Sequence, residues 1–177
     1  MAEINKSCKR AIKDTIKQLK IESEKKKQDN AKIYDLYLDL QAICQFGFLN
    51  DAENKEFYKQ YSDYIKEIAL NRVTDDAENA ETWRKLYWDI VKLESFWFFE
   101  SFLIYMEHKR PYEKRFYEPK KKTLKIVVDD LQNLEDSKTQ KMLTESMPAR
   151  TGKSTIMVFF GAWICLRHPS SHNAMCS

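Results

Sequence analysis

Residues 148–155 read Pro-Ala-Arg-Thr-Gly-Lys-Ser-Thr and stand between two stretches of different character. The preceding residues 141–147 (KMLTESM) predict a short strand, and the following residues 156–166 (IMVFFGAWICL) predict a buried helix. Residues 172–177 (HNAMCS) predict the start of a second strand. Strand, loop, helix and strand form the first unit of a parallel α/β sheet, so we expect such a sheet, truncated, in this part of the chain.

A Gly-Lys-Ser between a strand and a helix matches the second half of a phosphate-binding P-loop. Gly152 has no Cβ and lets the backbone approach a phosphate, and Lys153 supplies a positive charge for the β- and γ-phosphates. The Ser154 hydroxyl would coordinate Mg²⁺, while the helix N-terminus adds N–H donors and its dipole. The full motif has a further Gly where this chain has Met147, so an ordinary turn with a surface Lys is the alternative.

Residues 1–110 predict helices, because they contain no Pro and only one Gly. Apolar residues recur there at helical spacing, in four stripes. The stripes are Cys8, Ile12, Ile16 and Leu19; Ile33, Leu36, Tyr37, Leu40, Ile43 and Cys44; Phe57, Tyr61, Tyr64, Ile65 and Ile68; and Trp83, Leu86, Tyr87, Ile90, Leu93 and Trp97. We expect about four helices over 1–109, the last one long and rich in aromatic residues. That helix would form the centre of a bundle or, alternatively, a surface for a partner or for stacked bases.

The charges are distributed in blocks, although the net charge is only +3. Residues 1–30 have a net charge of +4, residues 31–107 of −7 and residues 108–125 of +6. The basic block at 108–125 can attract phosphates, or it can be a solvated connector. The predicted domains are a helical region (1–110), a basic connector with an amphipathic helix (111–140) and the truncated ATPase part (141–177).

Some functional classes are not expected from this sequence. No apolar run is long enough for a bilayer span, and the run 96–99 stops at Glu100; residues 1–10 (MAEINKSCKR) lack the apolar core of a secretion signal. We therefore expect no membrane association and no secretion. The four cysteines form no CxxC pair, which argues against a zinc site.

The stretch MPARTGKST, followed by FFGAWICLRHPSSHNAMCS, resembles the first ATPase motif of the large terminase subunit of tailed bacteriophages. That family often has Pro-Pro-Arg-x-Gly-Lys-Ser, and here Ala149 replaces the second Pro. Residues 107–111, 115–119 and 129–132 resemble a subgroup common in prophages of Gram-positive bacteria. The resemblance covers residues 95–177 and does not extend to the helical region before them.

The resemblance implies an ATP-driven motor that packages double-stranded viral DNA in the cytoplasm of a bacterial host, with ATP and Mg²⁺ as cofactors. The implied partners are the small terminase subunit, the portal protein and further copies of the chain in a ring. A nuclease domain would follow in the full-length protein. By the same resemblance, Lys153 would hold the β- and γ-phosphates and Ser154 would bind Mg²⁺. The other implied site residues are Pro148, Ala149, Arg150, Thr151 and Gly152 in the loop, Thr155 beside the α-phosphate, and Phe116 and Tyr117 at the adenine.

Two of these implied roles have alternatives. Arg150 would sense the γ-phosphate or act in coupling, and Phe116 and Tyr117 would stack on the base or pack in the core. The acidic groups that position Mg²⁺ and water lie on a later strand in this family and are not recognisable here. We therefore expect that these 177 residues alone do not hydrolyse ATP appreciably. We also expect the helix at 156–166 to be partly exposed, at Val158, Phe159, Phe160, Trp163 and Ile164.

A helical interaction module, or a prophage remnant, is the alternative function. A docking module would ignore ATP, whereas a motor fragment would bind it through Lys153. A small-molecule kinase is disfavoured, because such enzymes usually begin near their P-loop.

Overall fold

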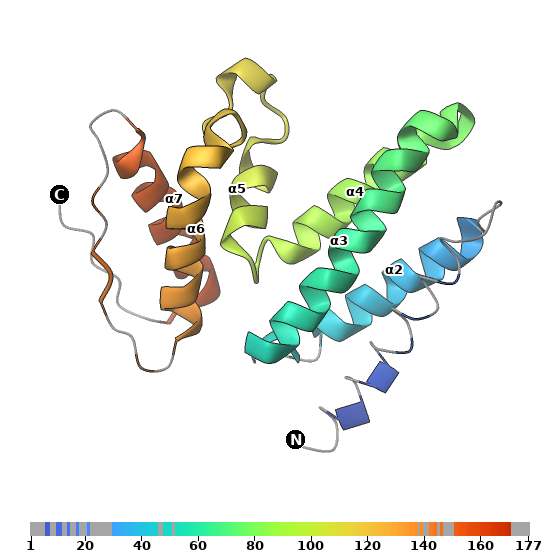
Figure 1. Ribbon diagram of the computed structural model, residues 1–177, viewed down its shortest axis with the longest axis horizontal. Helices are drawn as coiled ribbons and strands as arrows, with labels where there is room; N and C mark the ends of the chain where they lie inside the picture. The colour runs from blue at the N-terminus through green and yellow to red at the C-terminus, as the bar shows by residue number, and fades with distance from the viewer. Residues whose placement is uncertain are drawn as a thin grey trace. The chain divides into compact units, whose positions relative to one another are not determined.

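A computed structural model describes residues 30–45, 48–50, 52–137, 139, 142–144, 146 and 151–170, together with isolated positions between 6 and 21. The contacts divide the chain into two compact units, Met1–Leu93 and Glu94–Ser177. Each unit is helical in its described part (Figure 1).

The first unit contains the helices α2 (Asn30–Gln45), α3 (Ala52–Asp75) and α4 (Ala80–Glu94), with short 3₁₀ turns η1 (Phe48–Asn50) and η2 (Ala77–Asn79) between them. Its core consists of apolar side chains that recur every three or four residues. They include Ile33, Leu36, Tyr37, Tyr61, Ile65, Ile68, Trp83, Leu86 and Ile90. These residues confirm the second, third and fourth predicted stripes where side chains are described. The first stripe lies outside the described residues.

Two polar contacts fix elements of this unit. The Tyr61 hydroxyl on α3 donates to the Leu36 carbonyl on α2 at 2.7 Å. Burial raises the pKa of Tyr61, so its proton stays available for this bond. Asp76 caps η2 through the Asn79 backbone N–H and also accepts from the Trp83 indole N–H at 3.1 Å. The start of α4 is thereby anchored to the turn before it.

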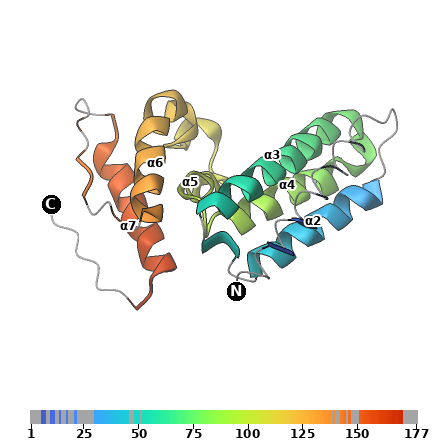
Figure 2. The same cartoon turned by 60° about the horizontal axis from the view of Figure 1, so that its bottom comes forward.

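The second unit contains α5 (Phe99–Glu107), η3 (Tyr112–Lys114), η4 (Glu118–Lys120), α6 (Lys121–Asp136) and α7 (Lys153–Arg167). The helices α5, α6 and α7 lie side by side (Figures 1 and 2). Their shared core is rich in aromatic and branched side chains. It contains Phe99, Phe102, Leu103, Tyr117, Leu124, Val127, Val128, Leu131, Ile156 and Trp163. The amphipathic helix predicted within residues 111–140 is confirmed as α6, whose buried residues repeat at helical spacing.

The predicted fold class, the start of an α/β P-loop NTPase domain with a parallel sheet, is wrong for the part of the chain that the structure describes. No strand occurs there, and residues 142–144 and 146 are neither helix nor strand. The physical reason is that helices cover the apolar face of α7. Trp163 is fully buried, its ring lies 5.3 Å from that of Phe99 on α5, and its indole N–H donates to the Ser95 carbonyl at 3.0 Å. The strand predicted at 172–177 lies outside the described residues.

The expected partial exposure of the helix at 156–166 is confirmed for Val158 and for the half-buried Phe159, Phe160 and Ile164, and it is wrong for Trp163. Met157, Val158 and Leu166 are exposed, whereas Trp163 is buried in the core.

The long fourth helix of the prediction is two helices in the structure. The helix α4 ends at Glu94, whose carbonyl accepts from the backbone N–H groups of Trp97 (2.8 Å) and Phe98 (2.9 Å), and α5 starts at Phe99. The Gln132 side chain on α6 accepts from the Phe99 N–H at 2.7 Å and thereby satisfies the first turn of α5. The apolar residues of 96–105 occupy too many faces for one straight helix to bury, and the break lets α5 bury its own set.

Candidate functional site

The N-terminus of α7 carries the residues that the sequence analysis singled out. Gly152 immediately precedes the helix and has φ of +103°, a backbone conformation that residues other than glycine rarely adopt. Its carbonyl accepts from the Ile156 N–H at 3.0 Å, which closes the first helical turn. A Cβ at position 152 would collide with the ring of Phe116. Glycine is therefore required here for two separate reasons, the backbone angle and the space.

The three residues after Gly152 are exposed on the first turn of α7. Lys153 makes no ion pair with any residue that the structure describes. The Ser154 and Thr155 side chains lie on the same turn, where the first backbone N–H groups of a helix have no carbonyl partner. These features favour an anion. Thr151 is half-buried, and Pro148, Ala149 and Arg150 lie outside the described residues.

Phe116 comes to this site from the segment between α5 and α6. Its ring stacks nearly parallel to that of Phe159 on α7, with 6.2 Å between centroids, and the Lys120 Nζ lies 5.4 Å from its centre. Tyr117, next in the chain, is fully buried in the core, and its hydroxyl donates to Glu100 at 2.9 Å. Its burial agrees with the core-packing alternative for Tyr117.

Glu107, at the end of α5, holds this segment in place. Its buried carboxylate accepts from the backbone N–H of Phe116 at 2.8 Å and from that of Tyr117 at 2.9 Å. Hydrogen bonds that a carboxylate accepts are among the stronger hydrogen bonds in proteins. Glu107 therefore fixes the point from which the Phe116 ring reaches Gly152.

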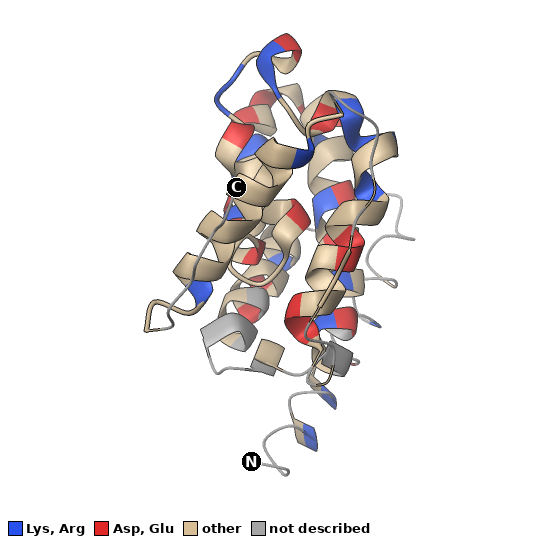
Figure 3. Cartoon of the chain, turned by 90° about the vertical axis from the view of Figure 1, so that its left-hand side faces the viewer, with Lys and Arg blue, Asp and Glu red and all other residues tan. Residues whose placement is uncertain are grey.

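Arg115 folds the rest of the same segment. Its guanidinium donates to the carbonyl oxygens of Arg110 (2.9 Å) and His108 (3.0 Å), and it pairs with Glu118. Lys and Arg occupy much of this segment, at the top of Figure 3. The segment 108–120 is thus a folded loop with two 3₁₀ turns rather than an extended connector.

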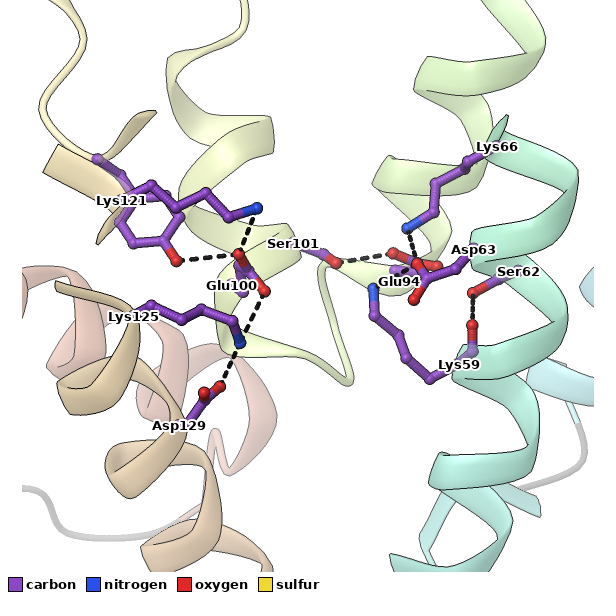
Figure 4. A network of polar contacts seen from close by, with 11 residues as sticks. Lys59, Ser62, Asp63, Lys66, Glu94, Glu100, Ser101, Lys121, Lys125 and Asp129 are labelled. Atoms are coloured by element: carbon purple, nitrogen blue, oxygen red, sulfur yellow. Dashed lines mark hydrogen bonds and ion pairs between the residues drawn. The ribbon is translucent and has the colours of Figure 1, made fainter. Parts of the chain in front are cut away.

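Glu100, on α5, is the centre of a charge network in the same unit. Its carboxylate lies 2.9 Å from the Lys121 Nζ and 3.2 Å from the Lys125 Nζ, and Lys125 also pairs with Asp129 (Figure 4). Burial alone would raise the pKa of Glu100, but the bonds and charges of the two lysines, with the Tyr117 hydroxyl, lower it to about 2. Burial and the Glu100 charge raise the pKa of Tyr117. The network ties the start of α6 to α5.

The described residues include no metal centre beside this loop. No group of three or more His, Cys, Asp and Glu side chains that could hold a metal ion occurs among them. Nor does any helix in the described part have the length and apolar character needed to cross a membrane.

Sequence reasoning missed Glu107 and Gln132, which act on backbone N–H groups in other parts of the second unit. Glu107 stands in an EHKRP stretch that carried a family resemblance, but its spacing from Phe116 gave no sign of a bond. In comparisons with protein-family models, curated proteins and solved structures, nothing matches this chain.

Proposed function

We propose that residues 148–155 bind the phosphates of ATP with Mg²⁺, and that the chain is the N-terminal part of a terminase large subunit, the DNA-packaging motor of a tailed bacteriophage. The observation that carries the proposal is Gly152, with φ of +103°, placed directly before Lys153 and Ser154 at the start of α7. The described residues before the loop, 142–144 and 146, form no strand, so the proposal rests on the loop and helix alone. ATP hydrolysis and DNA cleavage would require parts of the full-length protein beyond these residues.

Three features at the start of α7 favour the binding of a phosphate. A helix N-terminus carries about half a positive charge, and α7 has 15 residues over which peptide dipoles align. The exposed Lys153 adds a full charge. Gly152, with φ of +103°, turns the chain into the helix, and the Phe116 ring occupies the place that a Cβ at this position would take.

The residues of the loop and Phe116 have different roles at the nucleotide. Lys153 pairs with the β- and γ-phosphates, Ser154 contributes a hydroxyl to Mg²⁺, and Thr155 lies beside the α-phosphate. Arg150 acts at the γ-phosphate, and Phe116 offers an aromatic face to the base. The DNA, the small terminase subunit, the portal protein and a ring of copies are partners of the proposed full-length motor.

The test is the binding of Mg-ATP to the purified chain, measured by calorimetry. Lys153→Ala should weaken binding by roughly tenfold or more, because a charge-assisted bond contributes about 1.5–3 kcal/mol. Lys85→Ala, which removes another exposed lysine, is the matched control and should leave the affinity unchanged. Equal affinities for Lys153→Ala and the unaltered chain would reject the site.

A helical interaction module is the second candidate, and the exposed face of α7 favours it. Val158 is 61% exposed and Leu166 is 60% exposed on this helix. Apolar side chains exposed together on one helix are typical of a docking surface. This candidate predicts no response to ATP and loss of partner binding in Val158→Glu/Leu166→Glu.

A further inference from the structure

We propose that the loop between α5 and α6, together with the first turn of α6, contacts the phosphate backbone of DNA through Lys109, Lys114 and Lys122. This loop surface also includes Arg110 and the exposed Tyr112. The inference deepens the proposed function by giving its nucleic-acid partner a surface on this chain, and it rests on that function for the choice of duplex DNA. It does not depend on the nucleotide loop at 148–155.

This surface carries positive charge that acidic side chains do not compensate. Residues 108–125 contain eight Lys and Arg against two acids. Several of these cations already have acidic partners, since Arg115 pairs with Glu118 and both Lys121 and Lys125 pair with Glu100. Lys109, Lys114 and Lys122 are exposed and pair with no acid among the residues that the structure describes. Their charges are available to an external anion.

The loop holds Lys109 and Lys114 on a backbone that is fixed by hydrogen bonds, and Lys122 lies on α6. The Glu107 carboxylate bonds to two backbone N–H groups of the loop, and the Arg115 guanidinium bonds to two of its carbonyls. A solvated connector, the alternative considered for this basic block, has no need of a buried carboxylate to shape it. A surface that is ordered before binding loses less conformational entropy when it binds.

The spread of the three lysines indicates which kind of anion they bind. The three lysines lie on successive segments: the turn after α5, the 3₁₀ turn η3 and the first turn of α6. A polymer with regularly spaced phosphates can engage cations that are spread in this way. Tyr112, at 58% exposure, adds a hydroxyl that can donate to a phosphate oxygen. These features fit a nucleic-acid backbone, read without base sequence.

The experiment measures the anisotropy of a labelled duplex of arbitrary sequence as the full chain is added, over a series of NaCl concentrations. The test variant is Lys109→Gln/Lys114→Gln/Lys122→Gln. The control is Lys6→Gln/Lys17→Gln/Lys85→Gln, which removes the same charge from exposed positions elsewhere, two of them in the other basic block. Circular dichroism verifies that both variants keep their helices.

We expect the unaltered chain to bind the duplex with a salt-dependent affinity. The slope of log K against log[NaCl] should become shallower by about two to three in the test variant, since each lost phosphate contact removes about 0.9. The control should keep the slope of the unaltered chain. Equal losses in the two variants, absence of binding, or tighter binding to anionic vesicles than to DNA would each overturn the inference.

Mg-ATP binding, measured on the same proteins, separates this inference from the proposed function. The test variant should have the same affinity for Mg-ATP as the unaltered chain. Lys153→Ala should have the same affinity for DNA as the unaltered chain. If ATP binding is absent while the loop variant alone loses DNA, the proposed nucleotide site fails and the loop surface stands. If ATP binds through Lys153 but the loop variant keeps its full DNA affinity, the loop surface fails and the nucleotide site stands.

Discussion

The ring of Phe116 lies where the side chain of residue 152 would begin, so Phe116 and Gly152 are fitted to each other. The two residues belong to different segments of the second unit, and Glu107 fixes the backbone from which the ring extends. The start of α7 is therefore set by contacts with the loop between α5 and α6 as well as by its own sequence.

Gly152→Ala should destabilise the second unit by about 1–3 kcal/mol, because it combines a strained φ with a collision against the Phe116 ring. Urea unfolding followed by circular dichroism measures the change. Gly161→Ala, within α7, is the control and should be neutral or stabilising by up to about 1 kcal/mol. In a Phe116→Ala background the cost of Gly152→Ala should fall, because only the backbone strain remains. An unchanged cost in that background would show that the ring does not constrain position 152.

Glu107→Gln should destabilise the second unit by about 2–4 kcal/mol. The amide offers one acceptor where the carboxylate has two, and it places an N–H₂ against a backbone donor in a buried site. Hydrogen exchange measured by NMR should show faster exchange of the Phe116 and Tyr117 amides. Glu113→Gln, at an exposed position of the same loop, should alter neither stability nor exchange. Protected amides in Glu107→Gln would contradict the anchoring role.

Stability should fall in acid through Glu100. Its pKa is lowered from 4.5 to about 2, so its ionised form stabilises the fold above about pH 4.5, and this contribution is lost as the pH falls toward 2. The shift corresponds to at most about 3 kcal/mol at neutral pH. Glu100→Gln should therefore be less stable than the unaltered chain at pH 7, and the difference should shrink by pH 2.5. A carboxyl titration by NMR that gives Glu100 an ordinary pKa would refute this reading.

The helical periodicity sufficed to predict the core of the first unit and of α6. Residues such as Ile33, Ile65 and Ile90 are buried at the spacing that their stripes required. The burial partner of α7 could not be predicted in this way, because a short apolar run is compatible with a cover of strands or of helices. Helices cover α7 because the Trp163 ring packs against the Phe99 ring. These two residues are far apart in the sequence and share no local pattern.

Only part of the candidate site could likewise be predicted from the sequence. The position of Gly152, Lys153 and Ser154 at the start of a helix could be predicted, because Gly-Lys-Ser before an apolar run is a local motif. The resemblance named Phe116 only as a contact of the adenine, and neither the packing of its ring against Gly152 nor the anchoring by Glu107 was predicted. A carboxylate that accepts from backbone N–H groups nine and ten residues away leaves no periodic trace in the sequence.

The purified chain should release phosphate from ATP no faster than a blank, even where it binds Mg-ATP. Phosphoryl transfer needs an acid that positions Mg²⁺ and a group that orients water, and no such pair is recognisable in the sequence. A coupled phosphate-release assay over several hours measures the rate. Turnover that disappears in Lys153→Ala would refute this expectation, whereas turnover that persists in Lys153→Ala would indicate a contaminating enzyme.

Gln132→Leu should destabilise the second unit by about 1–2 kcal/mol, because the first turn of α5 loses its side-chain acceptor while the Phe99 N–H stays partly buried. The same side chain also donates to the Trp97 carbonyl (3.3 Å) and to Asp136 (2.8 Å), so its loss affects the turn before α5 as well. The neighbouring and exposed Asn133 supplies the control, since Asn133→Leu removes an amide that makes no side-chain bond to α5. Hydrogen exchange at Phe99 distinguishes the two variants. We expect it to accelerate only in Gln132→Leu, and equal protection in both would mean that the break between α4 and α5 forms without this cap.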